Sequence, residues 1–333
     1  MPEAELKISE RILVADIGGT HARLGIATFL PGTKKPTISQ FHVFECADHH
    51  DMEELIRHYV DTISVQAPTT ATLAVAGPLA DNKGKMTNLG WDFDGKVMAQ
   101  NLGFNKIYFM NDFGALAMAT PSLDGEDLLT VKSVNTPAKS PISVIGPGTG
   151  FGVALMVPNK DKYIPISCEG GHMSFAPKGD LEFRIWQNLS KEMDRVAVET
   201  LLSGIGLMRL YRALCGIHGS HPRNYDPRTI SQLGIENSDP ICKEALTVFC
   251  SLLGSVAGDI ALVHGAQGGI YLGGGILPKM SEFFLQSSFL ERFLDKSPME
   301  EYLSNIPIYL ITSPDAALIG AAIYGKEMLE FEA

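Results

Sequence analysis

The sequence predicts an α/β protein with two domains. Three observations support this: short apolar runs of strand character alternate with segments of helical periodicity, a hairpin with a Gly-Thr turn occurs once in each half, and 333 residues exceed what one small core accommodates. Because the hairpin recurs, we expect the two halves to repeat one arrangement.

The first hairpin covers residues 11–27, where two apolar runs flank Gly18-Gly19-Thr20. It is neither a P-loop, because no Gly-Lys-Ser/Thr follows, nor a dinucleotide fingerprint, because a strand follows the glycines. Its backbone N–H groups and the Thr20 hydroxyl can wrap a phosphate, and Asp16 can hold a metal's water shell. A Gly-rich hairpin without a ligand is an equal alternative.

Helical spacing of apolar residues predicts a helix over 51–63, and an apolar run predicts a strand over 70–76. A polar hairpin or loop, 81–94, follows. Within it, Asn88 near Trp91 suggests sugar binding, with an amide for hydroxyls and an aromatic ring for the apolar sugar face. From these residues alone, a turn Asn and a packing Trp are the favoured alternative.

A short buried strand is predicted over 107–110, followed by Asn111-Asp112 and a helix that starts near Gly114. In an open α/β sheet, ligands collect beyond the carboxyl ends of strands. Asp112 at such a place can accept a proton from a bound hydroxyl. The alternative is that Asp112 only caps the following helix.

The second hairpin, 142–157, follows a polar segment, 121–141, that reads as a linker or surface excursion. Its turn is Gly148-Thr149-Gly150, which corresponds to the Gly-Gly-Thr turn of the first hairpin. Two such turns facing one cleft would hold the phosphate chain of a nucleotide. The pair is a more specific signal than either turn alone.

Glu169 and His172 flank a Gly-Gly step that lets both side chains point to one spot, where they can bind substrate hydroxyls. Metal binding with Cys168 is a weaker alternative, because no cluster of Cys or His lies near in the sequence. Glu199 lies between an apolar patch and a Gly turn. Without context, a solvated helix glutamate is its favoured interpretation.

The bare backbone of Gly273, Gly274 and Gly275 would let a base or ribose approach closely, and a flexible turn is the alternative. The remaining expected elements are a core or subunit-facing helix over 240–264, strands over 269–272 and 306–311, and a small-residue helix over 315–325 of the kind found at interdomain hinges.

Composition excludes several classes of function. The net charge of -11 argues against nucleic-acid binding. We expect no membrane span, because no apolar stretch approaches the roughly 20 residues that a span needs, and no signal peptide, because the N-terminus is acidic. The five cysteines are scattered without a CxxC pair, which predicts free thiols in a reducing cytoplasm.

Together these motifs resemble the glucokinase family of bacterial type, within the actin/hexokinase superfamily. The resemblance covers Ile12 to Gly325. It is carried by Asp16-Ile17-Gly18-Gly19-Thr20, Asn111-Asp112-Phe113, Gly146-Pro147-Gly148-Thr149-Gly150, Glu169-Gly170-Gly171-His172, Glu199, Gly273-Gly274-Gly275 and residues 315–322. Each motif is weak alone, and their order makes the set specific.

The resemblance implies a two-domain actin-like ATPase (ribonuclease H-like) fold with a cleft between a small domain, 1–122 plus 314–333, and a large domain, 123–313. It implies a cytoplasmic homodimer that phosphorylates D-glucose to glucose 6-phosphate with ATP and Mg²⁺, the first step of glycolysis. It implies Asp112 as the base, with Mg²⁺ held mainly by ATP and by Asp16 through water. The implied glucose contacts are Asn88, Asn111, Asp112, Glu169, His172 and Glu199, and the implied ATP contacts are Asp16, Gly18, Gly19, Thr20, Gly148, Thr149, Gly150, Gly273, Gly274 and Gly275.

The sequence departs from the family pattern at His21, where the family usually has Asn, which leaves the contacts of the first turn open. We expect no repressor function, because the chain has neither a Cys-rich zinc motif after His172 nor room for a helix-turn-helix before the first strand. A kinase for mannose, fructose or an N-acetylhexosamine, and a non-catalytic sugar sensor, remain as alternatives.

Overall fold

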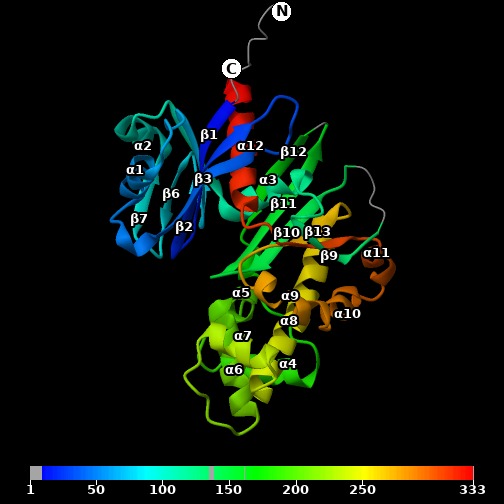
Figure 1. The fold of residues 1–333 in the computed structure, drawn as a ribbon. Coiled ribbons are helices and arrows are strands. Elements are labelled where there is room, and N and C mark those ends of the chain that lie inside the picture. The colour runs from blue at the N-terminus through cyan, green and yellow to red at the C-terminus, as the bar shows by residue number, and fades with distance from the viewer. Residues whose placement is uncertain (1–9, 135–138, 161, 333) are drawn as a thin grey trace, which may run out of the picture. The chain divides into compact units, whose positions relative to one another are not determined.

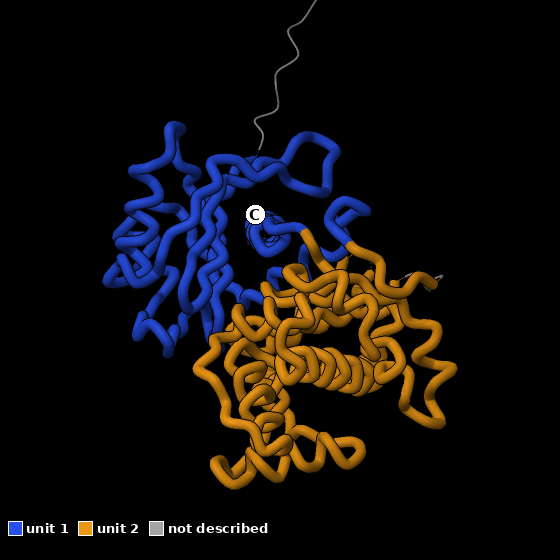
Figure 2. Tube along the Cα trace, turned by 60° about the horizontal axis from the view of Figure 1, so that its bottom comes forward, with its two compact units in different colours: residues 1–128, 313–333 blue, residues 129–312 orange. Residues whose placement is uncertain are grey.

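The computed structural model describes residues 10–134, 139–160 and 162–332, and it is an α/β protein with mixed sheets (Figure 1). The chain divides into two compact units: unit 1 comprises residues 1–128 and 313–333, and unit 2 comprises residues 129–312 (Figure 2).

Unit 1 is built on a five-stranded sheet of order β3-β2-β1-β4-β8. Its strands are β1 (Glu10–Ile17), β2 (His21–Phe29), β3 (Thr37–Glu45), β4 (Thr70–Val75) and β8 (Lys106–Asn111). A smaller sheet contains β5 (Leu79–Ala80), β6 (Lys83–Met86) and β7 (Trp91–Asp94). The helices are η1 (Cys46–Asp48), α1 (Met52–Thr62), α2 (Gly95–Leu102), α3 (Asp112–Ala119), η2 (Thr120–Ser122) and α12 (Ala316–Glu332).

Helices cover both faces of the five-stranded sheet in unit 1. The β1 residues Leu13 and Ala15 belong to one apolar cluster with α1 and α2, whereas Ile12, on the opposite face, lies beside Gly325 of α12. Successive side chains of a strand point to opposite faces, so this alternation places α12 on the second face. All six residues of β4 are buried, as expected of a strand that is covered on both faces.

Unit 2 is built on a six-stranded sheet of order β12-β11-β10-β13-β14-β9. Its strands are β9 (Leu128–Lys132), β10 (Ile142–Pro147), β11 (Phe151–Asn159), β12 (Lys162–Cys168), β13 (Gly269–Leu272) and β14 (Ile308–Ile311). Its helices are η3 (Gly170–His172), α4 (Gly179–Leu189), α5 (Val198–Leu201), α6 (Gly204–Ile217), α7 (Pro227–Ile235), α8 (Pro240–His264), η4 (Leu277–Met280), α9 (Ser281–Leu285), α10 (Phe289–Leu294) and α11 (Glu300–Ser304).

The two large sheets repeat one topology. In unit 1, β1 pairs antiparallel with β2 and parallel with β4. In unit 2, β10 pairs antiparallel with β11 and parallel with β13. The two Gly-Thr hairpins therefore occupy equivalent places, as their recurrence in the sequence predicts.

Two expectations about the chain are wrong. The segment 121–141 is not only a linker, because it contains β9, a short strand with the sequence LLTVK whose residues are mostly half-buried. The expectation that no segment is long and apolar enough to span a membrane also fails, because α8 meets that test by length and composition. The burial of α8 explains its apolar composition: 67% of its most apolar 18-residue stretch lies inside the protein, as in a core helix.

The outer edge of β8 is closed by a side chain rather than by another strand. Asn82, whose φ of 61° is left-handed, donates from Nδ2 to the carbonyl of Ile107 at 2.8 Å. Its Oδ1 accepts from the N–H of Phe109 at 2.7 Å. The amide thus satisfies two backbone groups of an edge strand that would otherwise be open.

Candidate active site

The strand-to-helix junction at Asn111-Asp112 lies where the sequence predicts it. β8 ends at Asn111, and α3 begins at Asp112. The cap of α3 is Asn111, whose Oδ1 accepts from the N–H groups of Phe113 and Gly114 at 3.0 and 3.1 Å. Asp112 Oδ1 accepts a local bond from the N–H of the adjacent Phe113 at 2.9 Å, outside the two bonds that Asn111 makes to the first turn of α3. Capping therefore does not require Asp112.

Sheet register brings this junction to the same edge as the first Gly-Thr turn. Val75 of β4 pairs with Ile17 of β1 on one side and with Asn111 of β8 on the other. Two strand spacings separate Ile17 from Asn111, about 10 Å of backbone. The turn and Asp112 consequently lie beyond the same edge of the sheet, at the carboxyl ends of these strands, which is where open α/β sheets bind ligands.

The first turn is held in shape by the backbone and by the end of β3. The N–H of Gly18 donates to the carbonyl of His21 at 3.0 Å, and the N–H of Cys46 donates to the carbonyl of Thr20 at 2.7 Å. The exposed Asn88 lies against this turn, since its Nδ2 is 3.5 Å from an ideal Cβ on Gly19. A residue singled out for sugar binding and a turn singled out for phosphate binding are therefore neighbours.

Trp91 does not share the position of Asn88. Its side chain is buried in the core of unit 1, at 5% exposure. It is unavailable to stack on a sugar ring, so the packing interpretation of Trp91 is the correct one.

His21 and Asp16 flank the first turn, and each has a charged partner. Nε2 of His21 lies 3.0 Å from Oε1 of Glu45, which turns the ring toward the end of β3. Asp16 Oδ2 accepts from Arg23 Nη1 at 3.0 Å. Burial raises the pKa of the Asp16 carboxyl, and Arg23 opposes that shift. Arg23 thus binds one oxygen of the Asp16 carboxylate, and Asp16 lies two residues before the first turn.

In unit 2, Glu169 and His172 come together as predicted. The carboxylate Oε2 of Glu169 and Nε2 of His172 are 4.0 Å apart, and both side chains are about two-thirds exposed. The carbonyl of His172 accepts from Arg195 Nη2 at 2.6 Å, which fixes the short η3 turn. Two polar side chains at this spacing can bind adjacent hydroxyls of one ligand.

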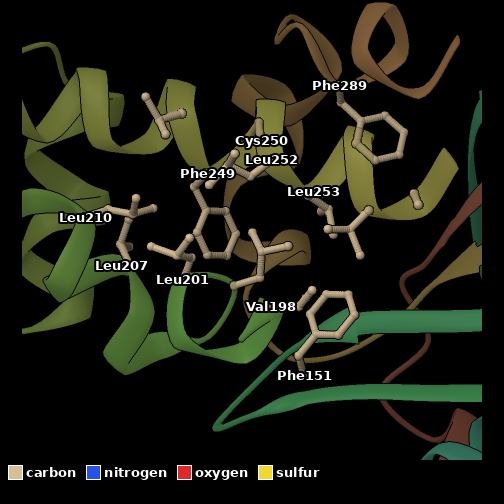
Figure 3. Close-up of a cluster of buried hydrophobic side chains, with 14 of the residues drawn as sticks. Phe151, Val198, Leu201, Leu207, Leu210, Phe249, Cys250, Leu252, Leu253 and Phe289 are labelled. Carbon is tan, nitrogen blue, oxygen red and sulfur yellow. The ribbon is translucent and has the colours of Figure 1, made fainter. Parts of the chain in front are cut away.

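Glu199 is not the solvated helix residue that the sequence alone favours. It is half-buried, and its Oε2 accepts from the N–H of Phe151 at 2.8 Å, directly after the second Gly-Thr turn. Its neighbours Val198 and Leu201 point into the same apolar cluster as Phe151 (Figure 3). Core packing on one side of α5 therefore holds the carboxylate against the β10–β11 hairpin.

The second turn adjoins the start of a helix, a feature that the sequence did not reveal. Gly148 N–H donates to the carbonyl of Gly150 at 2.8 Å, and the N–H of Gly204 donates to the carbonyl of Gly148 at 3.0 Å. Gly204 is the first residue of α6, which has 14 residues. Its N-terminal end carries partial positive charge, so an anion bound at Gly148-Thr149-Gly150 is favoured.

The triple glycine lies beside the second turn, and close packing between them requires glycine at Gly146 and at Gly274. An ideal Cβ on Gly146 would lie 2.0 Å from the carbonyl oxygen of Gly273, and one on Gly274 would lie 2.3 Å from that of Pro147. Gly275 meets no heavy atom within 4 Å. Gly275 thus borders open space, where a ligand can approach the backbone.

The structure does not support a metal centre at Cys168. Within residues 10–134, 139–160 and 162–332, there is no group of three or more His, Cys, Asp or Glu side chains placed to hold a metal ion. Burial, with the charge of Glu169, raises the pKa of the Cys168 thiol, which disfavours the thiolate that binds metals. All five cysteines are free thiols.

Comparison with known proteins agrees with this assembly of motifs. A glucokinase family model matches residues 13–328. A glucokinase of Saccharophagus degradans is 40% identical over 312 residues, which cover 94% of this chain and 97% of the relative.

Solved structures agree with the sequence comparison. The crystal structure of a glucokinase from an Antarctic psychrotroph has a TM-score of 0.85 at 40% identity and covers 95% of this chain and 99% of that one. A ROK family glucokinase from Streptomyces griseus, solved with glucose and AMPPNP, shares the fold at 16% identity, with a TM-score of 0.65 and coverage of 96% and 100%. The chain belongs to the glucokinase family.

Proposed function

We propose that this chain transfers the γ-phosphoryl group of ATP to the 6-hydroxyl of D-glucose and so catalyses the first step of glycolysis. Membership of the glucokinase family supports the reaction. The observation that carries the mechanism is the junction of β8 and α3, where Asn111 caps the helix. The Asp112 carboxylate, which directly follows the carboxyl end of β8, would accept the proton of the attacking hydroxyl.

The same proposal assigns roles to the other candidate residues. Asn88, Asn111, Glu169, His172 and Glu199 bind the pyranose hydroxyls and choose the sugar. Because Oδ1 of Asn111 is used by the cap of α3, its contribution to the sugar is donation from the amide NH₂. The phosphates lie on Gly18-Gly19-Thr20 and Gly148-Thr149-Gly150, with Gly273-Gly274-Gly275 beside the nucleotide.

Magnesium fits this proposal through an oxygen donor. Asp16 supplies a carboxylate next to the first turn. Because Oδ2 of Asp16 already accepts from Arg23, we propose that Asp16 would bind water molecules of the hydrated ion rather than the ion itself. Mg²⁺ bound with ATP would supply positive charge that offsets the charge on the phosphates.

Units 1 and 2 would act as the small and large domains of an actin-like sugar kinase, with the sugar bound in a cleft between them. Domain closure would exclude water, which otherwise accepts the phosphoryl group. We also propose that the enzyme acts in the cytoplasm as a homodimer, without nucleic-acid or membrane partners.

The proposed reaction is tested by a coupled ADP-release assay over a panel of hexoses. Glucose is expected to give the highest kcat/KM, with glucose 6-phosphate as the product. A higher kcat/KM for mannose, fructose or an N-acetylhexosamine would reassign the substrate. Absence of turnover with every hexose would indicate a non-catalytic sugar sensor.

Glu199→Gln is expected to raise KM for glucose about tenfold or more, with a smaller change in kcat. A hydrogen bond to a charged group is worth about 1.5–3 kcal/mol, and the amide keeps an oxygen that can accept from Phe151 N–H. Steady-state kinetics with varied glucose measure the effect. An unchanged KM would show that Glu199 only supports the hairpin, and the exposed Glu192→Gln provides the matched control.

A further inference from the structure

The chain passes between its two units twice, and the two passages are neighbours. Unit 1 ends at Leu128 and resumes at Ser313. The first passage continues as β9 and the second arrives from β14, and these two strands are adjacent in the sheet of unit 2. The connection is therefore a two-stranded ribbon rather than two independent linkers.

Asp127 joins the two strands of this ribbon at its unit 1 end. Its backbone carbonyl accepts from the N–H of Ser313 at 3.2 Å. Its carboxylate accepts from the N–H of Asp124 at 3.1 Å and from the side chain of Ser313. Asp127 is 8% exposed, which is unusual for a carboxylate on a connecting segment.

Lys35 neutralises this buried carboxylate from a distant part of unit 1. It lies in the loop between β2 and β3, and its Nζ donates to Asp127 Oδ2 while lying 3.6 Å from Asp124 Oδ2. Burial alone would raise the pKa of Asp127, but the bonds from Lys35 and from Asp124 N–H outweigh it and hold that pKa below its usual range. The same contact raises the pKa of Lys35.

The loop that carries Lys35 gives the ribbon a fixed support. It is bounded by β2 and β3, which pair in the main sheet of unit 1. A charge-assisted hydrogen bond is roughly twice as strong as a neutral one, and removing one partner of a buried pair leaves a charge without compensation. The Lys35–Asp127–Ser313 cluster, here named the clasp, thus ties both passages to the sheet at a single point.

We infer that Lys35 and Asp127 are positioning residues that make the clasp the fixed end of a hinge, so that substrate closes the two units along one defined path. This inference rests on the proposed function, because it concerns closure around the sugar. A loose ribbon would allow many open arrangements, each of which must be given up on closure. A clasped ribbon removes that entropy before substrate binds.

Lys35→Met tests the inference, with Lys34→Met as the matched control, because Lys34 is an exposed neighbour in the same loop. Lys35→Met is expected to raise KM for glucose about fivefold, with kcat within twofold of the wild type. A fivefold change corresponds to the conformational entropy of about one backbone residue that is mobile before glucose binds and ordered afterwards. Lys35→Arg, which keeps a charged donor, is expected to restore most of the affinity. Equal KM values for Lys35→Met and Lys34→Met would overturn the inference.

A second readout does not depend on activity. Small-angle X-ray scattering of the unliganded proteins is expected to give a larger radius of gyration for Lys35→Met and for Ser313→Ala than for Lys34→Met. Ser313→Ala removes one hydroxyl and changes no charge. It therefore still tests the clasp if Lys35→Met, which removes a charge, does not fold. An inactive wild type would refute the proposed function, while identical scattering of all variants would refute the clasp.

Discussion

Replacing Asp112 with asparagine is expected to lower kcat by about 10²- to 10⁴-fold, the usual contribution of a general base. The amide has the shape of the carboxylate but cannot take a proton from the sugar hydroxyl. Its oxygen can still accept from Phe113 N–H, and Asn111 still caps α3. The variant should therefore fold normally and bind glucose with little change in affinity.

The measurement is kcat from steady-state kinetics, together with glucose binding by calorimetry. Asp61→Asn, an exposed carboxylate on α1 of the same unit, is the matched control and should behave as the wild type. Turnover of Asp112→Asn near the wild-type value would remove Asp112 from the role of base. Lost binding with normal folding would instead assign it to holding the sugar.

Gly320→Ala is expected to lower the free energy of unfolding of unit 1 by about 3 kcal/mol or more, at the upper end of the range for overpacking. An ideal Cβ at Gly320 of α12 would lie 1.7 Å from the carbonyl oxygen of Ala115 in α3. That neighbour is backbone, so it cannot rotate away as a side chain would. Relief requires α3 and α12 to move apart in a close-packed interior.

Urea denaturation of Gly320→Ala in a Trp186→Phe background measures this loss of stability, because Trp91 fluorescence then reports on unit 1. Gly125→Ala is the control, because a Cβ there meets no heavy atom within 4 Å. Since α3 begins at Asp112, the expected separation of the helices also lowers kcat. An unfolding midpoint equal to that of Gly125→Ala would show that the two helices pack less tightly than described.

Features with a local cause could be predicted from the sequence. The runs that form β1, β4 and β8 are continuous because these strands are buried on both faces, and the glycines of each hairpin mark its turn. Asn111 and Asp112 directly follow an apolar run, which predicts the junction between β8 and α3. These signals need only neighbouring residues, so one sequence suffices to read them.

Features that depend on tertiary contacts could not be predicted. Glu199 reads as a surface residue until the β10–β11 hairpin is placed against it. Lys35 and Asp127 are 92 positions apart, and each reads as a loop residue. β9 could not be recognised because it has five residues, LLTVK, and its burial lacks the alternation that is typical of a half-buried strand.

The amide of Asn82 has a consequence for the behaviour of the protein in a crowded solution. An uncovered sheet margin is a template on which another polypeptide can add as a strand, the first step of amyloid-like growth. The side chain of Asn82 bonds the carbonyl of Ile107 and the N–H of Phe109, so these two groups are not available to pair with another polypeptide. The protected strand, β8, is the one that leads to Asp112. The strand that positions the proposed catalytic base is thus also the strand whose edge is closed against aggregation.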